Sequence, residues 1–570
     1  MTTKNLPQKP LRVMPAVIIV SIQMFIRFAI PPLIPEALIY CVFAGILGGV
    51  AILIWWLFFS RAAWWERIFA VILIFISLYI TSQLLEESIA TANMGLMFIL
   101  FSIPVLSIAF VAWAVVTRYL SAKIRIITMV ITIIASTGFW ALLRTEGMDG
   151  YIHHNLKWRW AKTAEEKFLE NNRDEELSAR LNDVNPSTGA EWSGFRGANR
   201  DGKIYNNKIE TDWKKRPPQL LWKRGIGPGC SSMAIKGEMI YTQEQRGEYE
   251  MVTCYNLNNG ELIWKHQDSA RFWDSHAGAG PRSTPTISGD RIYTLGATGI
   301  INVLNAKDGS VIWSRNGAND TGVKPLMWGF AGSPLVLDRI VIFAIAGKLA
   351  AYDIDTGNPL WYGEDGGNSY SSPQAFTIDN VLQVVHLNTK GAVGIDPLSG
   401  HILWKHEWKM EDRILQPAFI EPNDFIISAD GERGLRRISV IHENNNWTVK
   451  EVWSSVEMKL NFNDFFVHKG YAYGFDGPAI CCIDLKDGKR VWKGNRYRGF
   501  MILLADQDLL VILSEKGELA LVPANPNKIT ELSKIQAIKG RTWNHPSMAG
   551  DIIVTRNAEE MAAFKLAPAD

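Results

Sequence analysis

The hydrophobic pattern divides the chain into two unlike parts. Up to about residue 144 the sequence consists mainly of Ile, Leu, Val, Phe, Ala and Trp, in long apolar runs separated by short polar connectors. From about residue 151 onward, the apolar positions form short groups between polar stretches rich in Gly and Asp. Long apolar runs are typical of membrane-spanning helices, and short groups bounded by turn residues are typical of strands. The pattern therefore predicts an N-terminal α-helical membrane domain followed by an all-β domain.

Five apolar runs are long enough to cross a bilayer, which takes about 20 residues. The predicted transmembrane helices are residues 11–31, 37–59, 67–85, 95–117 and 126–143. The first run is the least regular, because Arg27 lies near its end and three prolines follow it. We expect Arg27 to snorkel to the membrane interface. If this first run only lay in the interface, the predicted topology would be inverted.

Lysine and arginine gather in alternate connectors between these runs. They are Lys4, Lys9 and Arg12 before the first run, Arg61 and Arg67 after the second, and Arg118, Lys123 and Arg125 after the fourth. These residues favour the cytoplasmic side of a membrane. Five spans with the N-terminus inside would place every basic cluster on that side. The sequence thus predicts a multi-pass protein of the bacterial inner membrane, with its C-terminal domain in the periplasm.

One ten-residue line recurs through the β part of the chain. It reads YNLNNGELIW up to Trp264, LNAKDGSVIW up to Trp313, YDIDTGNPLW up to Trp361, IDPLSGHILW up to Trp404 and IDLKDGKRVW up to Trp492. Two degenerate copies, PQLLW and NWTVKEVW, end at Trp222 and Trp453. The spacing between successive Trp residues is 39 to 49 residues. A period of about 40–50 residues is typical of propellers and repeat arrays.

Each copy of this line reads as strand, turn, strand. The Asp or Asn closes the first strand and accepts turn hydrogen bonds, while the Gly supplies the positive φ of a tight turn. The Trp at the end is well suited to fill the wedge between neighbouring blades. A second strand–turn–strand line precedes each copy, for example SSMAIKGEMIYTQ from Ser231 and GSPLVLDRIVIFA from Gly332. Eight such starts are present, so the sequence predicts eight blades.

Seven Trp lines must be reconciled with eight starts. We assign the eighth ending to ITELSKI, where Leu532 takes the Trp position. The last start, from His545, has no ending of its own, and the ending at Trp222 has no start. Joining the two closes the ring and protects sheet edges that would otherwise be exposed. The predicted domains are a transmembrane domain at 1–150, a linker helix and lead-in at 151–216, and an eight-bladed propeller at 217–570.

The D-x-x-x-G-x-x-x-W line resembles the signature of PQQ-type, or quinoprotein-like, propeller repeats. These repeats occur in quinoprotein dehydrogenases and in the propeller lipoprotein of the bacterial outer-membrane assembly machine. The resemblance covers roughly residues 190–567, and it implies a propeller of the wider WD40/YVTN-like repeat superfamily. The segment WSGFRGANRDG, from Trp192 to Gly202, resembles the lead-in of bacterial PQQ-like repeat proteins of unassigned activity. The resemblance implies a fold but only weakly an activity, because a fold does not fix chemistry.

Charge and cysteine content narrow the function further. The 570 residues carry a net charge of +2, so nothing indicates a nucleic-acid partner. Five cysteines imply no full disulfide framework, although one bridge between Cys230 and Cys254 stays open in an oxidising compartment. The adjacent Cys481 and Cys482 occupy a strand position of the repeat, and we interpret them as small apolar residues.

The stretch from Thr163 to Leu181 reads as a charged, solvated spacer helix.

Candidate binding residues lie in the loops that lead into the innermost strands, since these loops crowd one mouth of a propeller's channel. They are Trp273, His276, Arg282, Trp328, Tyr370, Arg413, Asn461, Asn463, Arg496, Arg498, Trp543, Asn544 and His545. Arg and His could bind the carboxylates of a flat polyanionic quinone, and Trp could stack on it. The alternative reading is that these side chains satisfy loop backbones and fill the mouth.

Resemblance to a quinoprotein dehydrogenase makes a sharper demand. It implies a calcium site built from a Glu, an Asn and an Asp, with an Asp as base. Asn461, Asn463 and Asp464 could supply part of this set, but no Glu is placed to complete it. We therefore assign no metal ligand and no catalytic residue from the sequence.

Two functions remain. The favoured one is a periplasmic platform, anchored in the lipid bilayer and without a cofactor, that binds a periplasmic protein partner or a small ligand at the propeller mouth. The alternative is a PQQ-dependent sugar or alcohol dehydrogenase, holding PQQ with calcium and passing electrons to membrane quinone.

Overall fold

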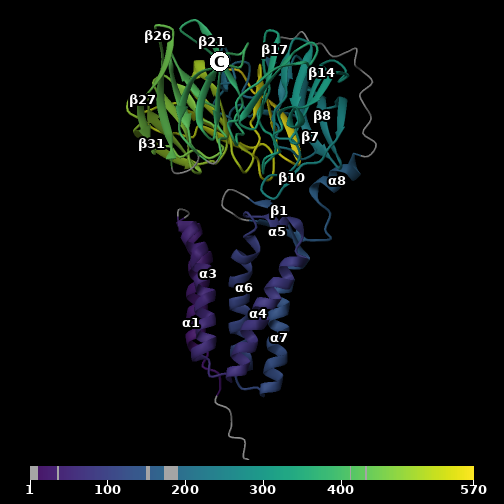
Figure 1. Ribbon diagram of the computed structural model, residues 1–570, viewed down its shortest axis with the longest axis vertical. Helices are drawn as coiled ribbons and strands as arrows, with labels where there is room; N and C mark the ends of the chain where they lie inside the picture. The colour runs from purple at the N-terminus through teal and green to yellow at the C-terminus, as the bar shows by residue number, and fades with distance from the viewer. Residues whose placement is uncertain are drawn as a thin grey trace, which may run out of the picture. The chain divides into compact units, whose positions relative to one another are not determined.

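The computed structural model describes residues 10–34, 37–148, 154–172, 191–410, 412–429 and 433–569. The chain forms two compact units. One consists of residues 1–162 and the short segment 274–276, and the other consists of residues 163–273 and 277–570. The first unit is helical and the second is all-β apart from short helices (Figure 1).

Five helical segments of the first unit are long and apolar enough to cross a membrane, as the sequence predicts. They are Met14–Leu33, Leu38–Phe59, Trp64–Leu84, Met97–Thr117 and Ala122–Leu142. The α-helices within them are α1 (Met14–Met24), α2 (Ile30–Leu33), α3 (Leu38–Ile54), α4 (Trp64–Leu84), α6 (Met97–Thr117) and α7 (Ala122–Gly138). Large apolar side chains such as Tyr40 and Val116 stay exposed on the helices, which suits a lipid environment.

A buried ion pair links two helices of the helical unit. The carboxylate of Glu66, in the first turn of α4, lies 2.7 Å from the guanidinium of Arg125 in α7, and both are buried. Arg27 is also buried, with its guanidinium carbon 5.0 Å from the ring centroid of Phe101. Arg27 therefore faces α6 through a cation–π contact, and its depth relative to the membrane interface stays a prediction. A short helix α5 (Glu87–Thr91) and the hairpin β1 (Leu143–Met148)–β2 (His154–Trp158) complete the unit.

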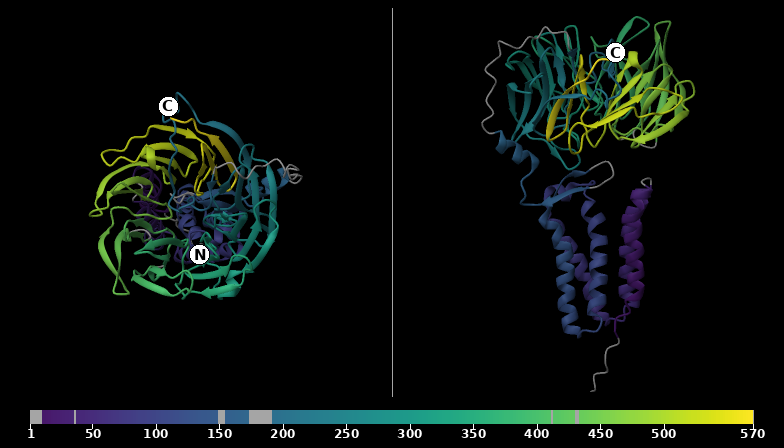
Figure 2. Two further views of the ribbon diagram at one scale, coloured as in Figure 1. Left: turned by 90° about the horizontal axis from the view of Figure 1, so that it is seen from above. Right: turned by 180° about the vertical axis from the view of Figure 1, so that it is seen from behind.

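Eight sheets of the second unit form the ring of blades that the sequence predicts (Figure 2). Blades 1 to 4 are β6–β9 (Ala234–Lys236, Met239–Arg246, Tyr249–Asn256, Leu262–Ser269), β12–β15 (Thr286–Ser288, Arg291–Leu295, Ile300–Asn305, Val311–Asn316), β16–β19 (Leu335–Leu337, Ile340–Ile345, Lys348–Asp353, Pro359–Tyr362) and β20–β23 (Gln374–Ile378, Val381–Asn388, Gly391–Ile395, Ile402–Glu407).

Blades 5 to 7 follow the same antiparallel order. They are β24–β27 (Ala418–Ile420, Asp424–Ser428, Leu435–Glu443, Asn446–Ser455), β28–β31 (Phe466–His468, Tyr471–Asp476, Ala479–Asp484, Arg490–Arg496) and β32–β35 (Phe500–Leu504, Leu509–Leu513, Glu518–Pro523, Ser533–Gln536). Blade 8 combines β36–β38 (Ser547–Ala549, Ile552–Arg556, Glu560–Lys565) with β5 (Gln219–Gly225) from the start of the propeller. The predicted ring closure is thus confirmed: β5 pairs with β38, and Trp222 lies opposite Ala563.

The Trp of one blade packs against the signature Gly of the next. Trp264 Nε1 donates to the carbonyl of Ala306 in blade 2 at 3.0 Å, and a Cβ on Gly309 would lie 2.5 Å from the Trp264 ring. The other pairs of this kind are Trp222 with Gly260, Trp313 with Gly357, Trp361 with Gly400 and Trp453 with Gly488. The Gly of the repeat therefore has two roles, since it provides the positive φ of its turn and the space for an indole.

Blade 7 departs from the predicted repeat. The sequence assignment put Leu532 at the Trp position, but the register places Ser533 opposite Leu521, and Leu532 is exposed. Ser533 Oγ accepts a hydrogen bond from the backbone N–H of Trp213 at 3.1 Å. Trp213 is buried in the core shared with blade 8. An indole from outside the repeat thus joins the core here, which the line ITELSKI could not reveal.

The segment ahead of the propeller lies inside the ring. The first strands of neighbouring blades contact one another, as β6 does with β12 and β36, so they are the innermost strands. On their inner side, β3 (Glu191–Trp192) pairs with β6 and β4 (Lys203–Ile204) pairs in parallel with β32. Residues 191–205, which we call the lead-in plug, therefore occupy the central channel. The sequence predicted a lead-in at these residues, but not that it lies inside the ring.

Candidate functional site

Two of the predicted mouth arginines are buried and bonded to main-chain carbonyls. Arg282 donates from Nη2 to Gly278 O at 2.6 Å and from Nε to Trp328 O at 3.3 Å. Arg413, only 2% exposed, donates from Nε to Asn388 O at 3.1 Å and also bonds the carbonyls of Ser428 and Trp408. Both guanidinium groups tie loops together.

The predicted amide and aromatic side chains also link neighbouring blades. Asn463 donates to Gly499 O at 2.8 Å. Asn544 donates to Gly229 O at 3.0 Å and to Ser231 O at 2.8 Å. The rings of Trp328 and Tyr370 lie 5.0 Å apart between centroids, at 37°. These contacts agree with the alternative reading of the sequence, in which mouth side chains satisfy loop backbones.

The remaining predicted residues are more scattered. Trp543 Nε1 donates to Glu515 Oε1 at 2.7 Å, and Arg498 Nε lies 4.0 Å from Glu515 Oε2. The structure places Asn461 half-buried before blade 6, Arg496 exposed at the end of β31 and Trp273 in the short strand β10 (Trp273–Asp274). His276 falls in the segment 274–276, outside the propeller unit, and its backbone N–H donates to Asp274 Oδ1 at 2.7 Å.

A buried ion cluster joins the predicted mouth to the lead-in plug. The carboxylate of Asp464 lies 2.9 Å from His545 Nε2 and 3.5 Å from Arg196 Nη1. Burial opposes ionisation of Asp464, but Arg196 and His545 outweigh it and hold the pKa of Asp464 below its ordinary value. Arg196 also donates to Phe465 O at 3.1 Å. Arg196 was missed by the sequence reading, because its partner lies 268 residues away.

The residues that could bind PQQ and calcium do not fit that role well. Of the calcium set suggested by the sequence, Asn463 donates its amide to Gly499 O, and Asp464 pairs with Arg196 and His545. No cluster of three or more His, Cys, Asp or Glu with metal-binding geometry occurs among the described residues. The lead-in plug, moreover, places Arg196 against Asp464 at this end of the channel. We therefore derive no catalytic step through PQQ.

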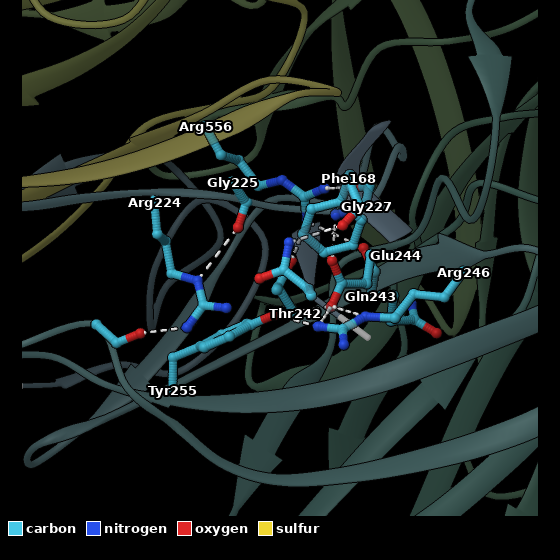
Figure 3. Close-up of polar contacts among 12 residues, drawn as sticks. Phe168, Arg224, Gly225, Gly227, Thr242, Gln243, Glu244, Arg246, Tyr255 and Arg556 are labelled. Carbon is cyan, nitrogen blue, oxygen red and sulfur yellow. Dashed lines mark hydrogen bonds and ion pairs between the residues drawn. The ribbon is translucent and has the colours of Figure 1, made fainter. Parts of the chain in front are cut away.

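A second buried charged cluster lies where the ring closes (Figure 3). We call this place the seam: here the C-terminal strands β37 and β38 meet β5, Gly227 and β7. Glu244, on β7, is fully buried and accepts hydrogen bonds from Gly227 N at 2.5 Å, Tyr255 OH at 2.7 Å and Arg246 Nη2 at 2.8 Å. Burial opposes its ionisation, yet Arg246 and Tyr255 outweigh burial, and the pKa of Glu244 falls below its ordinary value. Arg556 of blade 8 is fully buried beside it and reaches across to blade 1.

The linker helix docks on this seam. Helix α8 (Ala164–Asn171) begins with a capping box between Thr163 and Glu166. Its Phe168 is buried, with the Arg246 guanidinium carbon 5.1 Å from the ring centroid. Glu165 Oε1 accepts from Gly247 N and Arg271 Nη1, both at 2.9 Å. The prediction of a solvated spacer is therefore wrong for α8, and residues 173–181 lie outside the described residues.

The cysteines carry no disulfide. All five are free thiols, so the bridge left open between Cys230 and Cys254 is not formed. Cys481 and Cys482 lie in β30, fully buried, as the strand interpretation predicts. Burial raises the pKa of Cys482 to about 12, with a hydrogen bond to Tyr473 opposing the shift. A thiol with so high a pKa is a poor nucleophile.

Comparison with known proteins places these features in a family. A family model described as "Outer membrane protein assembly factor BamB" matches residues 210–406 and, overlapping them, residues 250–494. Outer membrane protein assembly factor BamB of Shewanella oneidensis is 21% identical over 378 residues, covering 62% of this chain and 89% of that protein. Quinohemoprotein alcohol dehydrogenase ADH-IIG of Pseudomonas putida is 23% identical over 180 residues, covering 28% of this chain and 24% of that protein. The crystal structure of BamB from Moraxella catarrhalis aligns at a TM-score of 0.44 and 13% identity, covering 61% of this chain and 98% of that one.

Proposed function

The chain belongs to the PQQ-type propeller family whose model is described as "Outer membrane protein assembly factor BamB". We propose that it is a membrane-anchored platform that binds a protein partner in the periplasm. The similarity to BamB of Shewanella oneidensis covers most of that protein and supports this reading. In this proposal the propeller is a rigid scaffold, and its loops and outer faces provide the binding surface.

One observation carries the proposal. The polar side chains at the predicted mouth, such as Arg413, Asn463 and Asn544, bond main-chain carbonyls of the propeller itself. The lead-in plug lies against them through the ion cluster of Arg196 and Asp464. A scaffold gains rigidity from such bonds, whereas a cofactor site would need these donors to face the cofactor. Only the exposed residues of the predicted mouth, such as Arg496, stay candidates for contact with a small ligand.

The membrane half of the proposal rests on the helices and their connectors. Five helices could cross a bilayer by length and composition. The basic connectors favour a cytoplasmic N-terminus, which would put the propeller in the periplasm of a bacterial inner membrane. Single cysteines can test this orientation in a chain carrying Cys230→Ser. Leu398→Cys, in an exposed propeller turn, should react with a membrane-impermeant maleimide on intact spheroplasts, and Tyr119→Cys, in a predicted cytoplasmic connector, should react only after permeabilisation. The reverse pattern would overturn the orientation.

The alternative function is a PQQ-dependent dehydrogenase that oxidises a sugar or alcohol. The similarity to a quinohemoprotein alcohol dehydrogenase favours it, but that similarity covers only 24% of the enzyme. A titration of the full chain with PQQ and calcium, followed by Trp fluorescence, separates the two functions. The platform predicts no saturable quenching at tens of micromolar PQQ. Calcium-dependent quenching that weakens in Arg282→Ala or Trp543→Ala would favour the dehydrogenase instead.

A further inference from the structure

A cavity of about 690 Å³ lies within the ring, between the lead-in plug and blades 3 to 6. One wall consists of plug residues from Arg196 to Tyr205, and the other of the first strands β16, β20, β24 and β28. The predicted mouth residues precede these strands, whereas the cavity extends to their far ends at Leu337 and Glu421. It therefore extends away from the predicted mouth toward the other side of the channel. Its volume falls in the range of about 300–1,000 Å³ that is usual for small-molecule sites.

The wall formed by the first strands is mainly apolar and aromatic, whereas the plug wall is mainly polar and charged. Phe376, Phe419 and Phe466 line it, together with aliphatic residues of the same strands. The rings of Phe376 and Phe419 lie 5.2 Å apart between centroids. Such a surface suits the body of an apolar or aromatic ligand, because burying it against these rings removes apolar area from water.

Cationic side chains of the plug lie at one side of the cavity. Arg200 is 8% exposed and donates to Pro334 O at 2.7 Å and Ser333 O at 2.9 Å, but its Nε has no hydrogen-bond partner. No carboxylate pairs with Arg200 in the described part of the chain, and burial lowers its pKa to about 10. Burial likewise lowers the pKa of Lys203, opposed by Asp201 and Glu421, two carboxylates that also line the cavity. A buried guanidinium without a counter-charge is costly, and a bound anion would offset that cost.

We propose that this cavity binds a small amphipathic carboxylate, with its apolar or aromatic body along Phe376, Phe419 and Phe466 and its carboxylate at Arg200 and Lys203. The site is independent of the proposed platform function, because a protein partner would bind outer loops and faces. It also differs from the predicted quinone site, since it extends to the far ends of the first strands and its strand wall is apolar.

Calorimetric titration of the full chain in non-ionic detergent with 4-phenylbutyrate tests the proposal, and 4-phenyl-1-butanol serves as its uncharged counterpart. We expect one saturable site that binds the carboxylate about tenfold more tightly than the alcohol, the usual size of one charge-assisted contact. Ala375→Trp fills the cavity from β20 and should abolish binding. Lys203→Met should weaken carboxylate binding about three- to tenfold. Lys208→Met, three residues after the plug and outside the cavity lining, should leave it unchanged.

Thermal unfolding of each variant shows whether it is folded, and Lys203→Met keeps the test decisive if Ala375→Trp does not fold. Absence of saturable binding up to about 10 mM would overturn the proposal, because weaker binding corresponds to under ~3 kcal/mol. Binding that survives Ala375→Trp would place the ligand elsewhere and overturn it too. Equal affinity for the carboxylate and the alcohol would refute the role of Arg200 and Lys203.

Discussion

Replacing Arg556 by Met should open the seam at which the propeller closes. Arg556 is the last residue of β37 in blade 8 and is fully buried. Its guanidinium donates to Thr242 Oγ1 at 2.6 Å, Gln243 O at 3.0 Å and Gly227 O at 3.1 Å, all on the other side of the seam (Figure 3). Met has a similar length but no donor, so the substitution removes these bonds and little volume.

The magnitude follows from the groups left behind. Two buried carbonyls would lose a donor at ~1–3 kcal/mol each, whereas the Thr242 hydroxyl keeps its own bond to Ser232 O at 2.8 Å. Glu244 would also lose one of its two nearby cations, while Arg246 remains. We expect a loss of about 3–6 kcal/mol, a large share of the ~5–15 kcal/mol that stabilises a typical domain.

Urea unfolding of the full chain in detergent, followed by Trp fluorescence, measures this loss. Hydrogen exchange of residues 219–225 reports the seam directly, and these amides of β5 should exchange faster in Arg556→Met. Arg224→Met is the matched control: Arg224 lies on the same seam but is half-exposed, with its Nη1 donating to Gly260 O at 2.6 Å. It should cost about 1 kcal/mol, because its half-exposed acceptor can bond water and the main loss is the contact with the Tyr255 ring at 4.4 Å. Equal losses in the two variants, or an unchanged Arg556→Met, would refute the closure argument.

Two further predictions concern stability. Gly309→Ala should destabilise the propeller by about 1–3 kcal/mol more than Gly289→Ala, because both glycines have positive φ but only a Cβ at Gly309 meets the buried Trp264; equal midpoints of unfolding would contradict this. Burial raises the pKa of Glu250 to about 7. Between the pKa of the unfolded chain and pH 7, the folded protein therefore binds more protons than the unfolded chain. The free energy of unfolding should fall by roughly 2–3 kcal/mol as the pH rises from about 5 to about 8. Glu250→Gln should remove that part of the pH dependence, and an unchanged slope in urea midpoints against pH would show that Glu250 is not its source.

Local repetition made most of the fold predictable. The spacing of the Trp lines indicated eight blades and the closure of β38 with β5, because each line encodes its own strand–turn–strand unit. The second role of the signature Gly was not visible, since it depends on an indole from the preceding blade. Leu532 was misassigned for the same reason, as Trp213 enters that core from outside the repeat.

Long-range contacts account for what the sequence could not give about the site. The loops before the first strands could be identified from the repeat, but not the acceptors that Arg413 or Asn544 would bond. The lead-in plug depends on pairing between Arg196 and Asp464, which are far apart in sequence. Arg196 and Arg200 both have positive φ, an uncommon conformation for residues with a side chain, and no periodic pattern encodes it.

Native mass spectrometry of the full chain, extracted from its own membranes in mild detergent, tests the central claim most directly, because one spectrum reports both protein partners and small cofactors. A binding platform predicts a species heavier than the 64.0 kDa chain by one whole polypeptide, in a constant ratio and without the mass of PQQ. A chain that is recovered alone, or that carries PQQ and calcium, would contradict the account.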